Sequence, residues 1–245
     1  MARQLAVLKA AIGWATAVLV CGVWLPAAAQ DQEGSADSRI SRDQAKANND
    51  KARRAMKDVA RCVYRREPDL SEKFLANSDP EGINHEGFGV NSDDFVEKMK
   101  LDSCLGTIMH DLQNTMTLHI RPISLRSYLA EESYLKSVEE PLRMTEEDNE
   151  VLANRFFRAT ASSAARYRAA FADCVVFNSP DLSDALMRTR ITTDAETKAV
   201  QALVPALSKC LLDGQETELT VQTIRALVAE GLWARIEYGG KASLR

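Results

Sequence analysis

The chain has 245 residues, 45% of them hydrophobic, which is enough for one ordinary domain or two small domains with a buried core. Its 31 basic and 35 acidic residues give a net charge of −4, which argues against nucleic acid as a partner. The densest arginine cluster lies between Arg53 and Arg66, and because it is spread around one amphipathic helix we interpret it as solvated surface. The sequence contains no G-x-S-x-G, P-loop, G-x-G-x-x-G or C-x-x-C motif, so hydrolase, nucleotide-binding and redox functions lack their usual support.

Residues 1–29 have the pattern of a secretory signal peptide. Arg3 and Lys9 are followed by an uncharged apolar run over residues 10–25, 16 residues long, and then by three alanines. This order predicts cleavage before Gln30, and the run is shorter than the roughly 18–20 residues that a membrane-spanning helix needs. The mature chain keeps 29 basic and 35 acidic residues, a net charge of −6. We therefore expect an exported protein, periplasmic or extracellular, that is not an integral membrane protein after cleavage.

The mature chain begins with a polar stretch and continues into two helices. Residues 30–50 are rich in Ser, Asp, Gln and Asn, with few apolar residues, and we expect a disordered leader. Residues 51–66 place apolar side chains at helical spacing, with Cys62 in the apolar stripe. Pro68 suits the first turn of a second, short helix that ends near Leu75.

A longer loop separates these helices from the next two. Residues 77–92 contain a proline and three glycines, which predicts a loop. A third helix is expected from about residue 92 to 108, with Cys104 on its apolar face. Residues 115–121 alternate apolar and polar side chains and predict an extended segment, and a fourth helix is expected over 124–137.

The second half of the chain repeats this order after an acidic joint over residues 136–145. Thr145 is followed by three acidic residues and predicts the start of a helix. Four helices are expected in this half, over residues 145–177, 180–187, 194–212 and 221–236. Residues 239–245 are expected to be a frayed tail.

The two halves share motifs as well as order. Residues 62–71 and 174–183 both read Cys-Val, four residues, then Pro-Asp-Leu-Ser. A second cysteine follows each in a Leu-x-x-Cys-Leu setting, and Leu-Arg-x-x-Leu-Ala-Glu at 125–131 matches Ile-Arg-x-x-Val-Ala-Glu at 224–230. The sequence therefore predicts an all-α protein made of two similar units of about four helices each, over residues 51–140 and 145–238.

Four of the five cysteines remain after signal cleavage, and disulfides are expected in an oxidising compartment. Four cysteines allow three pairings. A bridge within the ancestral unit would be duplicated with it, which favours Cys62 with Cys104 and Cys174 with Cys210. Each loop of about 40 residues would contribute on the order of 4 kcal/mol to stability. Bridges between the units and free buried thiols are the alternatives.

Taken together, these motifs resemble an uncharacterised family of small exported proteins from alphaproteobacteria, over residues 59–233. The resemblance implies a duplicated helical fold, export and disulfides. It implies no activity and no catalytic residue.

The duplicated polar residues are the first candidate site. Arg126 with Glu131 and Arg225 with Glu230 occupy the same positions in the two matching helices. They could frame an anionic pocket in each unit. The alternative is that each of them pairs with its own neighbouring helix or points into solvent.

The histidines are the second candidate site. His85, His110 and His119 all lie in the first unit, in segments where it is longer than the second. With Glu86 or Asp111 they could bind zinc and activate water. No pair has a ligand spacing such as HExxH, so an ordinary surface or helix-end role is the simpler interpretation.

We expect from these observations a non-enzymatic exported protein, without a cofactor, that binds another protein or scaffolds the cell surface. Its partner would be a protein or an envelope component. The alternative function is a metal-dependent enzyme that uses the histidines of the first unit. The sequence identifies neither a reaction nor a ligand.

Overall fold

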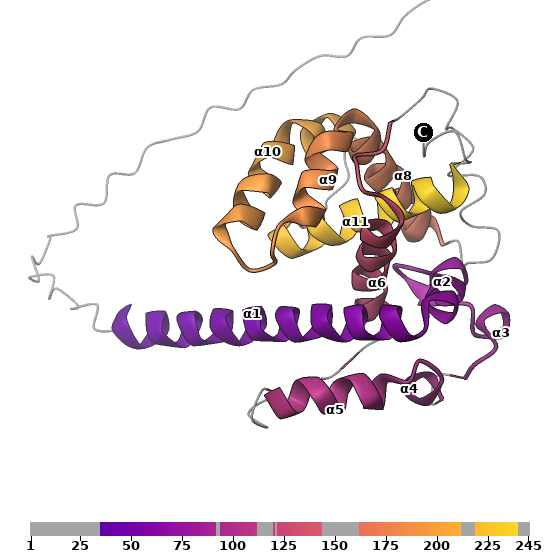
Figure 1. Cartoon of the computed structure of the whole chain (residues 1–245). Helices are drawn as coiled ribbons and strands as arrows, with labels where there is room; N and C mark the ends of the chain where they lie inside the picture. The colour runs from indigo at the N-terminus through magenta and orange to yellow at the C-terminus, as the bar shows by residue number, and fades with distance from the viewer. Residues whose placement is uncertain are drawn as a thin grey trace, which may run out of the picture. The chain divides into compact units, whose positions relative to one another are not determined.

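Figure 1 shows the computed structural model of the chain, which describes residues 35–91, 94–111, 120, 122–143, 162–211 and 219–239. These residues are almost entirely helical, and the all-α prediction is confirmed. The predicted signal peptide (1–29), extended segment (115–121) and tail (239–245) lie wholly or mostly outside them, as does the first part of the helix predicted over 145–177. The chain divides into two compact parts, residues 1–41 and residues 42–245, and the fold presented below is that of residues 42–245.

Each half of the sequence contributes helices in the same order. The first half has α1 (Ser35–Arg66), α2 (Pro68–Ala76), α3 (His85–Phe88), α4 (Phe95–Lys98), α5 (Leu101–Asp111) and α6 (Pro122–Ser137). The second half has α8 (Ser163–Asn178), α9 (Pro180–Arg188), α10 (Asp194–Cys210) and α11 (Val221–Tyr238). Each duplicated motif falls on equivalent elements, with Pro-Asp-Leu-Ser opening α2 and α9 and the Arg and Glu motif on α6 and α11. We call the two sets the first copy and the second copy.

The first helix differs from the prediction at its start. We expected a disordered leader over 30–50, but α1 begins at Ser35 and continues to Arg66. Residues 44–49 of this helix are exposed. We predicted disorder because residues 30–50 have no apolar face. The later turns of α1 pack against the core, however, and the helix extends back from them through Ala, Lys, Gln and Arg residues, whose helix propensity is favourable.

The segment between α2 and α5 is more structured than expected. The loop predicted over 77–92 contains a two-stranded hairpin of β1 (Ser78–Asp79) and β2 (Gly82–Ile83), followed by α3. The Asp79 carboxylate accepts the backbone N–H groups of Glu81 and Gly82 and so closes the hairpin turn. The predicted third helix is divided into α4 and α5, because Lys100 adopts a left-handed φ of 53°.

Both predicted disulfides are present. Cys62 of α1 is bonded to Cys104 of α5, and Cys174 of α8 is bonded to Cys210 of α10. The Cα atoms are 5.8 Å apart in each pair, the ordinary separation for a disulfide. Each copy therefore has its first helix joined covalently to the helix that precedes its last, α5 in the first copy and α10 in the second.

The core is one continuous cluster of buried apolar side chains that includes residues of both copies. Helix α11 packs against α6 of the first copy and α8 of its own copy (Figure 1). In the first copy, Phe88 of α3 packs edge-to-face on Phe74, with ring centroids 5.5 Å apart, so the inserted segment is anchored to the core. None of the described helices combines the length and the apolar character that a membrane crossing requires.

Candidate functional site

The four duplicated polar residues meet at the contact between α6 and α11. Arg126 Nη2 of the first copy lies 2.8 Å from Glu230 Oε2 of the second, and Arg225 Nη2 of the second lies 2.6 Å from Glu131 Oε1 of the first. All four residues are only 1–3% exposed. The ion pairs therefore cross between the copies. Each of these residues pairs with a neighbouring helix, and sequence spacing did not show that this helix belongs to the other copy.

Each of these arginines also binds the end of a helix in its own copy. Arg126 Nη1 donates to the Leu75 carbonyl at 2.6 Å, and Arg225 Nη2 donates to the Met187 carbonyl at 3.0 Å. The last carbonyls of a helix lack partners within the helix and carry partial negative charge, so a buried cation stabilises them. Each arginine thus ties the end of α2 or α9 to the opposite copy.

A second pair of hydrogen bonds follows the same crossed pattern. Trp233 Nε1 donates to Glu72 Oε2 at 3.1 Å, and Tyr134 Oη donates to Asp184 Oδ1 at 2.7 Å. Tyr134 and Trp233 occupy equivalent positions, and Glu72 and Asp184 each follow a Pro-Asp-Leu-Ser motif. Reciprocal contacts of this kind are those of two copies related by a local two-fold axis. Burial, followed by the hydrogen bond to Asp184, raises the pKa of Tyr134 well above its ordinary value.

The two copies differ where the first and last helices of each copy meet. Gly231 of α11 lies against α8 so closely that a Cβ atom there would be 2.8 Å from the Ala172 carbonyl oxygen. The equivalent residue of α6 is Glu132, which pairs with Lys57 of α1 at 2.5 Å and with Arg61 at 3.4 Å. In the first copy, charged side chains therefore lie between α1 and α6. In the second copy, small residues at the equivalent positions allow close contact between α8 and α11.

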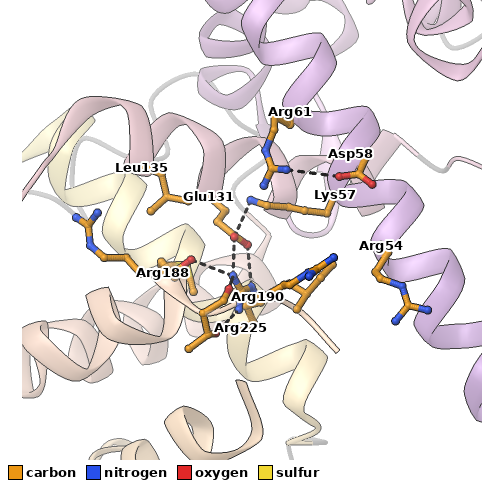
Figure 2. A pocket seen from close by; sticks show the side chains of 12 residues that line it. Arg54, Lys57, Asp58, Arg61, Glu131, Leu135, Arg188, Arg190 and Arg225 are labelled. Atoms are coloured by element: carbon orange, nitrogen blue, oxygen red, sulfur yellow. Dashed lines mark hydrogen bonds and ion pairs between the residues drawn. The ribbon is translucent and has the colours of Figure 1, made fainter. Parts of the chain in front are cut away.

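A cleft of about 680 Å³ lies beside this contact, between α1 of the first copy and the end of α9 of the second. Figure 2 shows side chains from α1 on one side of it and side chains from α6, α9, the following loop and α11 on the other. Of the 12 described residues that line the cleft, six are cationic and two are acidic. The cationic residues are Arg54, Lys57, Arg61, Arg188, Arg190 and Arg225, and the acidic ones are Asp58 and Glu131.

The floor of the cleft is a network of ion pairs between buried side chains. Glu131 Oε1 accepts from Arg225 Nη2 and lies 2.6 Å from Lys57 Nζ, and Glu131 Oε2 accepts from Arg225 Nε at 2.9 Å. Burial acts to raise the pKa of Glu131, but the bonds from Arg225 and the charge of Lys57 outweigh it and hold that pKa below 4.5. Glu131 is therefore a fixed carboxylate near neutral pH and is not suited to be a general acid or base.

The rim of the cleft is different, because two of its arginines form no ion pair within the described residues. Arg54 is exposed and donates to the neutral hydroxyl of Thr192 at 2.7 Å, and Arg190 is exposed in the loop after α9. Within the described part of the chain, neither Arg54 nor Arg190 forms an ion pair with a carboxylate. Arg188, in contrast, binds Asp184 through Nε at 2.8 Å. The cationic side chains available to an incoming anion thus lie on opposite walls.

The predicted site residues have separate positions. Arg225 and Glu131 line the cleft, but their polar atoms are occupied by each other and by neighbours. Arg126 and Glu230 are buried at the equivalent crossing and do not line this cleft. The residues that sequence analysis missed are Arg54 and Arg61, which we interpreted as solvated surface. Comparing the copies would have indicated Arg61, which stands where the second copy has Asp173, but not Arg54, whose equivalent is Arg166.

The histidines do not form a metal site in the described residues. His85 is exposed at the start of α3, and its Nδ1 lies 2.9 Å from the Val90 carbonyl oxygen. The side chains of His110 and His119 lie outside the described residues. No group of three or more His, Cys, Asp or Glu side chains suited to a metal ion is found within the part that is described.

No family model matches this sequence, and neither the curated proteins nor the solved structures that we searched include a match. The resemblance to a family of small exported proteins remains a prediction. The functional argument therefore depends on the geometry of the cleft.

Proposed function

We propose that this is an exported, non-enzymatic protein that binds an acidic component of the cell envelope through the basic cleft between α1 of its first copy and the end of α9 of its second. The observation that carries the proposal is the placement of Arg54 and Arg190 on opposite walls of a cleft of about 680 Å³, without carboxylate partners in the described residues. Cations that line a recess attract anions from solution and hold them away from competing water. The remaining chain is acidic, so the cleft is a local exception to its charge.

Two further features support export and a binding role. Two disulfides and the absence of a membrane-crossing helix among the described residues are compatible with an exported protein, and the first 29 residues resemble a signal peptide. The described lining of the cleft contains no histidine, cysteine or serine, and its carboxylate at Glu131 is held ionised. These side chains are suited to holding an anion rather than to transforming it.

The binding role is tested with poly-L-glutamate as a mimic of an acidic envelope component. We expect the purified mature protein to bind immobilised poly-L-glutamate at low ionic strength, and the binding to weaken with salt as exposed charges are screened. The variant Arg54→Ala/Arg190→Ala should lose at least tenfold in affinity. The matched control Arg65→Ala/Lys198→Ala removes two exposed cations outside the cleft and should retain the affinity. Equal losses in both variants, or no binding by the wild type, would overturn the proposal.

Export is tested separately by fractionating the native organism. We expect the protein in the periplasm or the medium, with an N-terminus at Gln30 and the linked peptides of Cys62 with Cys104 and of Cys174 with Cys210. A cytoplasmic protein with an intact N-terminus would contradict export and would leave the cleft without its proposed envelope partner.

A further inference from the structure

The two uncommitted arginines of the cleft reach it from separate parts of the fold. Arg54 belongs to α1 of the first copy, and Arg190 belongs to the loop between α9 and α10 of the second copy. Figure 2 shows Arg54 on α1, with Arg190 and Arg225 on the other side of the cleft. A ligand that satisfies both arginines must therefore present negative charge to two walls at once.

The present hydrogen bond of Arg54 is weaker than the bond it could form with an anion. Its Nη1 donates to the hydroxyl of Thr192, a neutral acceptor, at 2.7 Å. A carboxylate or phosphate oxygen forms a charge-assisted hydrogen bond with guanidinium, which is shorter and about twice as strong. The planar fork of arginine also allows two parallel bonds to one carboxylate or phosphate group. An anion would therefore compete well with Thr192 for Arg54.

The opposite wall is held in place before any ligand arrives. Thr192 adopts a left-handed φ of 58°, which is rare for a β-branched residue, and its backbone N–H donates to Glu196 Oε2 at 2.8 Å. Glu196 is only 1% exposed and also accepts from Arg53 of α1 at 2.8 Å. The loop that carries Arg190 is thus fixed against α1, and rare backbone conformations of this kind concentrate at ligand-binding sites.

The size and lining of the cleft favour a compact ligand. A volume of about 680 Å³ lies within the range of about 300–1,000 Å³ that is usual for small-molecule sites. Leu135, Met187 and Ile191 provide apolar surface for a carbon skeleton between the charged walls.

We propose that the cleft binds a compact ligand, or the compact end of a larger one, that carries at least two carboxylate or phosphate groups, one held by Arg54 and one by Arg190. This inference rests on the proposed function and specifies its ligand class. The two anionic groups connect α1 to the loop between α9 and α10. Because the second group binds within the same molecule, its attachment follows the first at high effective concentration, and a divalent ligand binds more tightly than its monovalent counterpart.

The test is calorimetric titration of the disulfide-bonded mature protein with two matched pairs of probes. Acetate is compared with tricarballylate, and inorganic phosphate is compared with pyrophosphate, all at the same low ionic strength. We expect the multivalent member of at least one pair to bind at least tenfold more tightly than its monovalent counterpart. The pair with the larger ratio identifies whether the anionic groups are carboxylates or phosphates.

Variants decide whether both walls take part. Arg54→Ala and Arg190→Ala should each reduce the preference for the multivalent probe to less than about threefold, whereas Arg65→Ala/Lys198→Ala should leave it unchanged. Because Arg54 and Arg190 are exposed, thermal melting of each variant checks that its fold is retained. Equal affinities for monovalent and multivalent probes, or a preference that survives either substitution, would overturn the bridging ligand while leaving the binding of poly-L-glutamate intact. Loss of poly-L-glutamate binding itself is the outcome that overturns the proposed function.

Discussion

The contact between the first and last helices is built in two ways in the two copies. In the second copy, Gly231 of α11 and Ala172 of α8 bring the helices into close contact, and Arg235 closes the edge by binding Asp173 at 2.6 Å. In the first copy the equivalent helices, α1 and α6, are bridged by Lys57 and Glu132, and a basic cleft adjoins them. One contact is therefore closed by small residues, and the other is bridged by buried charged residues beside a cleft.

What the copies share is the crossed network at α6 and α11. Each arginine of this network binds a glutamate of the other copy and a helix end of its own, so neither copy completes its polar contacts alone. The shared network holds the two copies in one orientation. The residues that differ between the copies, at the contact of the first helix with the last, lie beside the cleft. Predictions about the network test what the two copies share. Predictions about the contact between the first and last helices test how the copies differ.

The largest effect is expected from breaking the shared network. Arg126→Met should lower the free energy of unfolding by about 3–5 kcal/mol, because it removes the cation from a buried ion pair and from the Leu75 carbonyl. Arg225→Met should cost a similar amount, since Arg225 has the equivalent role. Urea unfolding measures both, and Arg65→Ala, at an exposed position, should change stability by less than about 0.5 kcal/mol. A small loss for either methionine variant would show that the copies are not held together by these pairs.

The next largest effect is expected where the copies differ. Gly231→Ala should destabilise the protein by about 1–3 kcal/mol, because the added Cβ would lie 2.8 Å from the Ala172 carbonyl oxygen. Gly106→Ala in α5 is the matched control, since a Cβ there meets nothing within 4 Å. Alanine is the better helix former, so Gly106→Ala should be neutral or stabilising by up to about 1 kcal/mol. If the two variants have the same effect in urea unfolding, the close contact between α8 and α11 is not a constraint.

A smaller effect is expected from the second set of crossed bonds. Tyr134→Phe should cost about 1 kcal/mol, because it removes one buried hydrogen bond to Asp184, whose carboxylate keeps its bonds from Arg188. The measurement is again the free energy of unfolding in urea. No measurable loss would mean that the apolar ring of Tyr134, and not its hydroxyl, is what joins the two copies at this point.

The smallest change is expected in the dependence of stability on pH. The pKa of Glu131 is lower in the folded protein than its ordinary value of 4.5, so its ionised form stabilises the fold. This contribution is complete above the unfolded-state pKa and is lost as the pH falls through the folded-state pKa. The stability difference between the wild type and Glu131→Gln should therefore be constant from about pH 6 to 7 and should shrink below about pH 4.5. A difference that grows on acidification would contradict the assigned sign.

The sequence was sufficient for the features that the duplication preserves. The Cys-Val to Pro-Asp-Leu-Ser motif identified two copies, and because a bridge inside the unit would be duplicated with it, the pairing of Cys62 with Cys104 could be predicted. The start of α2 at Pro68 followed from the suitability of proline for the first helical turn. The start of α2 depends only on local sequence. The cysteine pairing could be predicted because the sequence contains the motif twice.

Features that depend on the packing of one copy against the other could not be predicted. The spacing of Arg126 and Glu131 along one helix shows that they share a region of surface, but it does not show that their partners are Glu230 and Arg225. The cleft depends on how α1 lies against the end of α9. The break at Lys100 was also missed, because the apolar spacing continues across it and only the backbone conformation interrupts the helix.

The most direct test is to map where a small anion binds on the two copies. Backbone amide shifts of the isotopically labelled mature protein would be recorded by NMR during titration with tricarballylate and with pyrophosphate. We expect shifts to concentrate in residues 53–61 of α1 and 188–193 after α9, with residues 166–173 of α8 and 228–235 of α11 unaffected. Shifts of equal size in residues 166–173 of α8 and 228–235 of α11, or none at the cleft, would contradict the claim that the cleft between α1 and the end of α9 is the binding site.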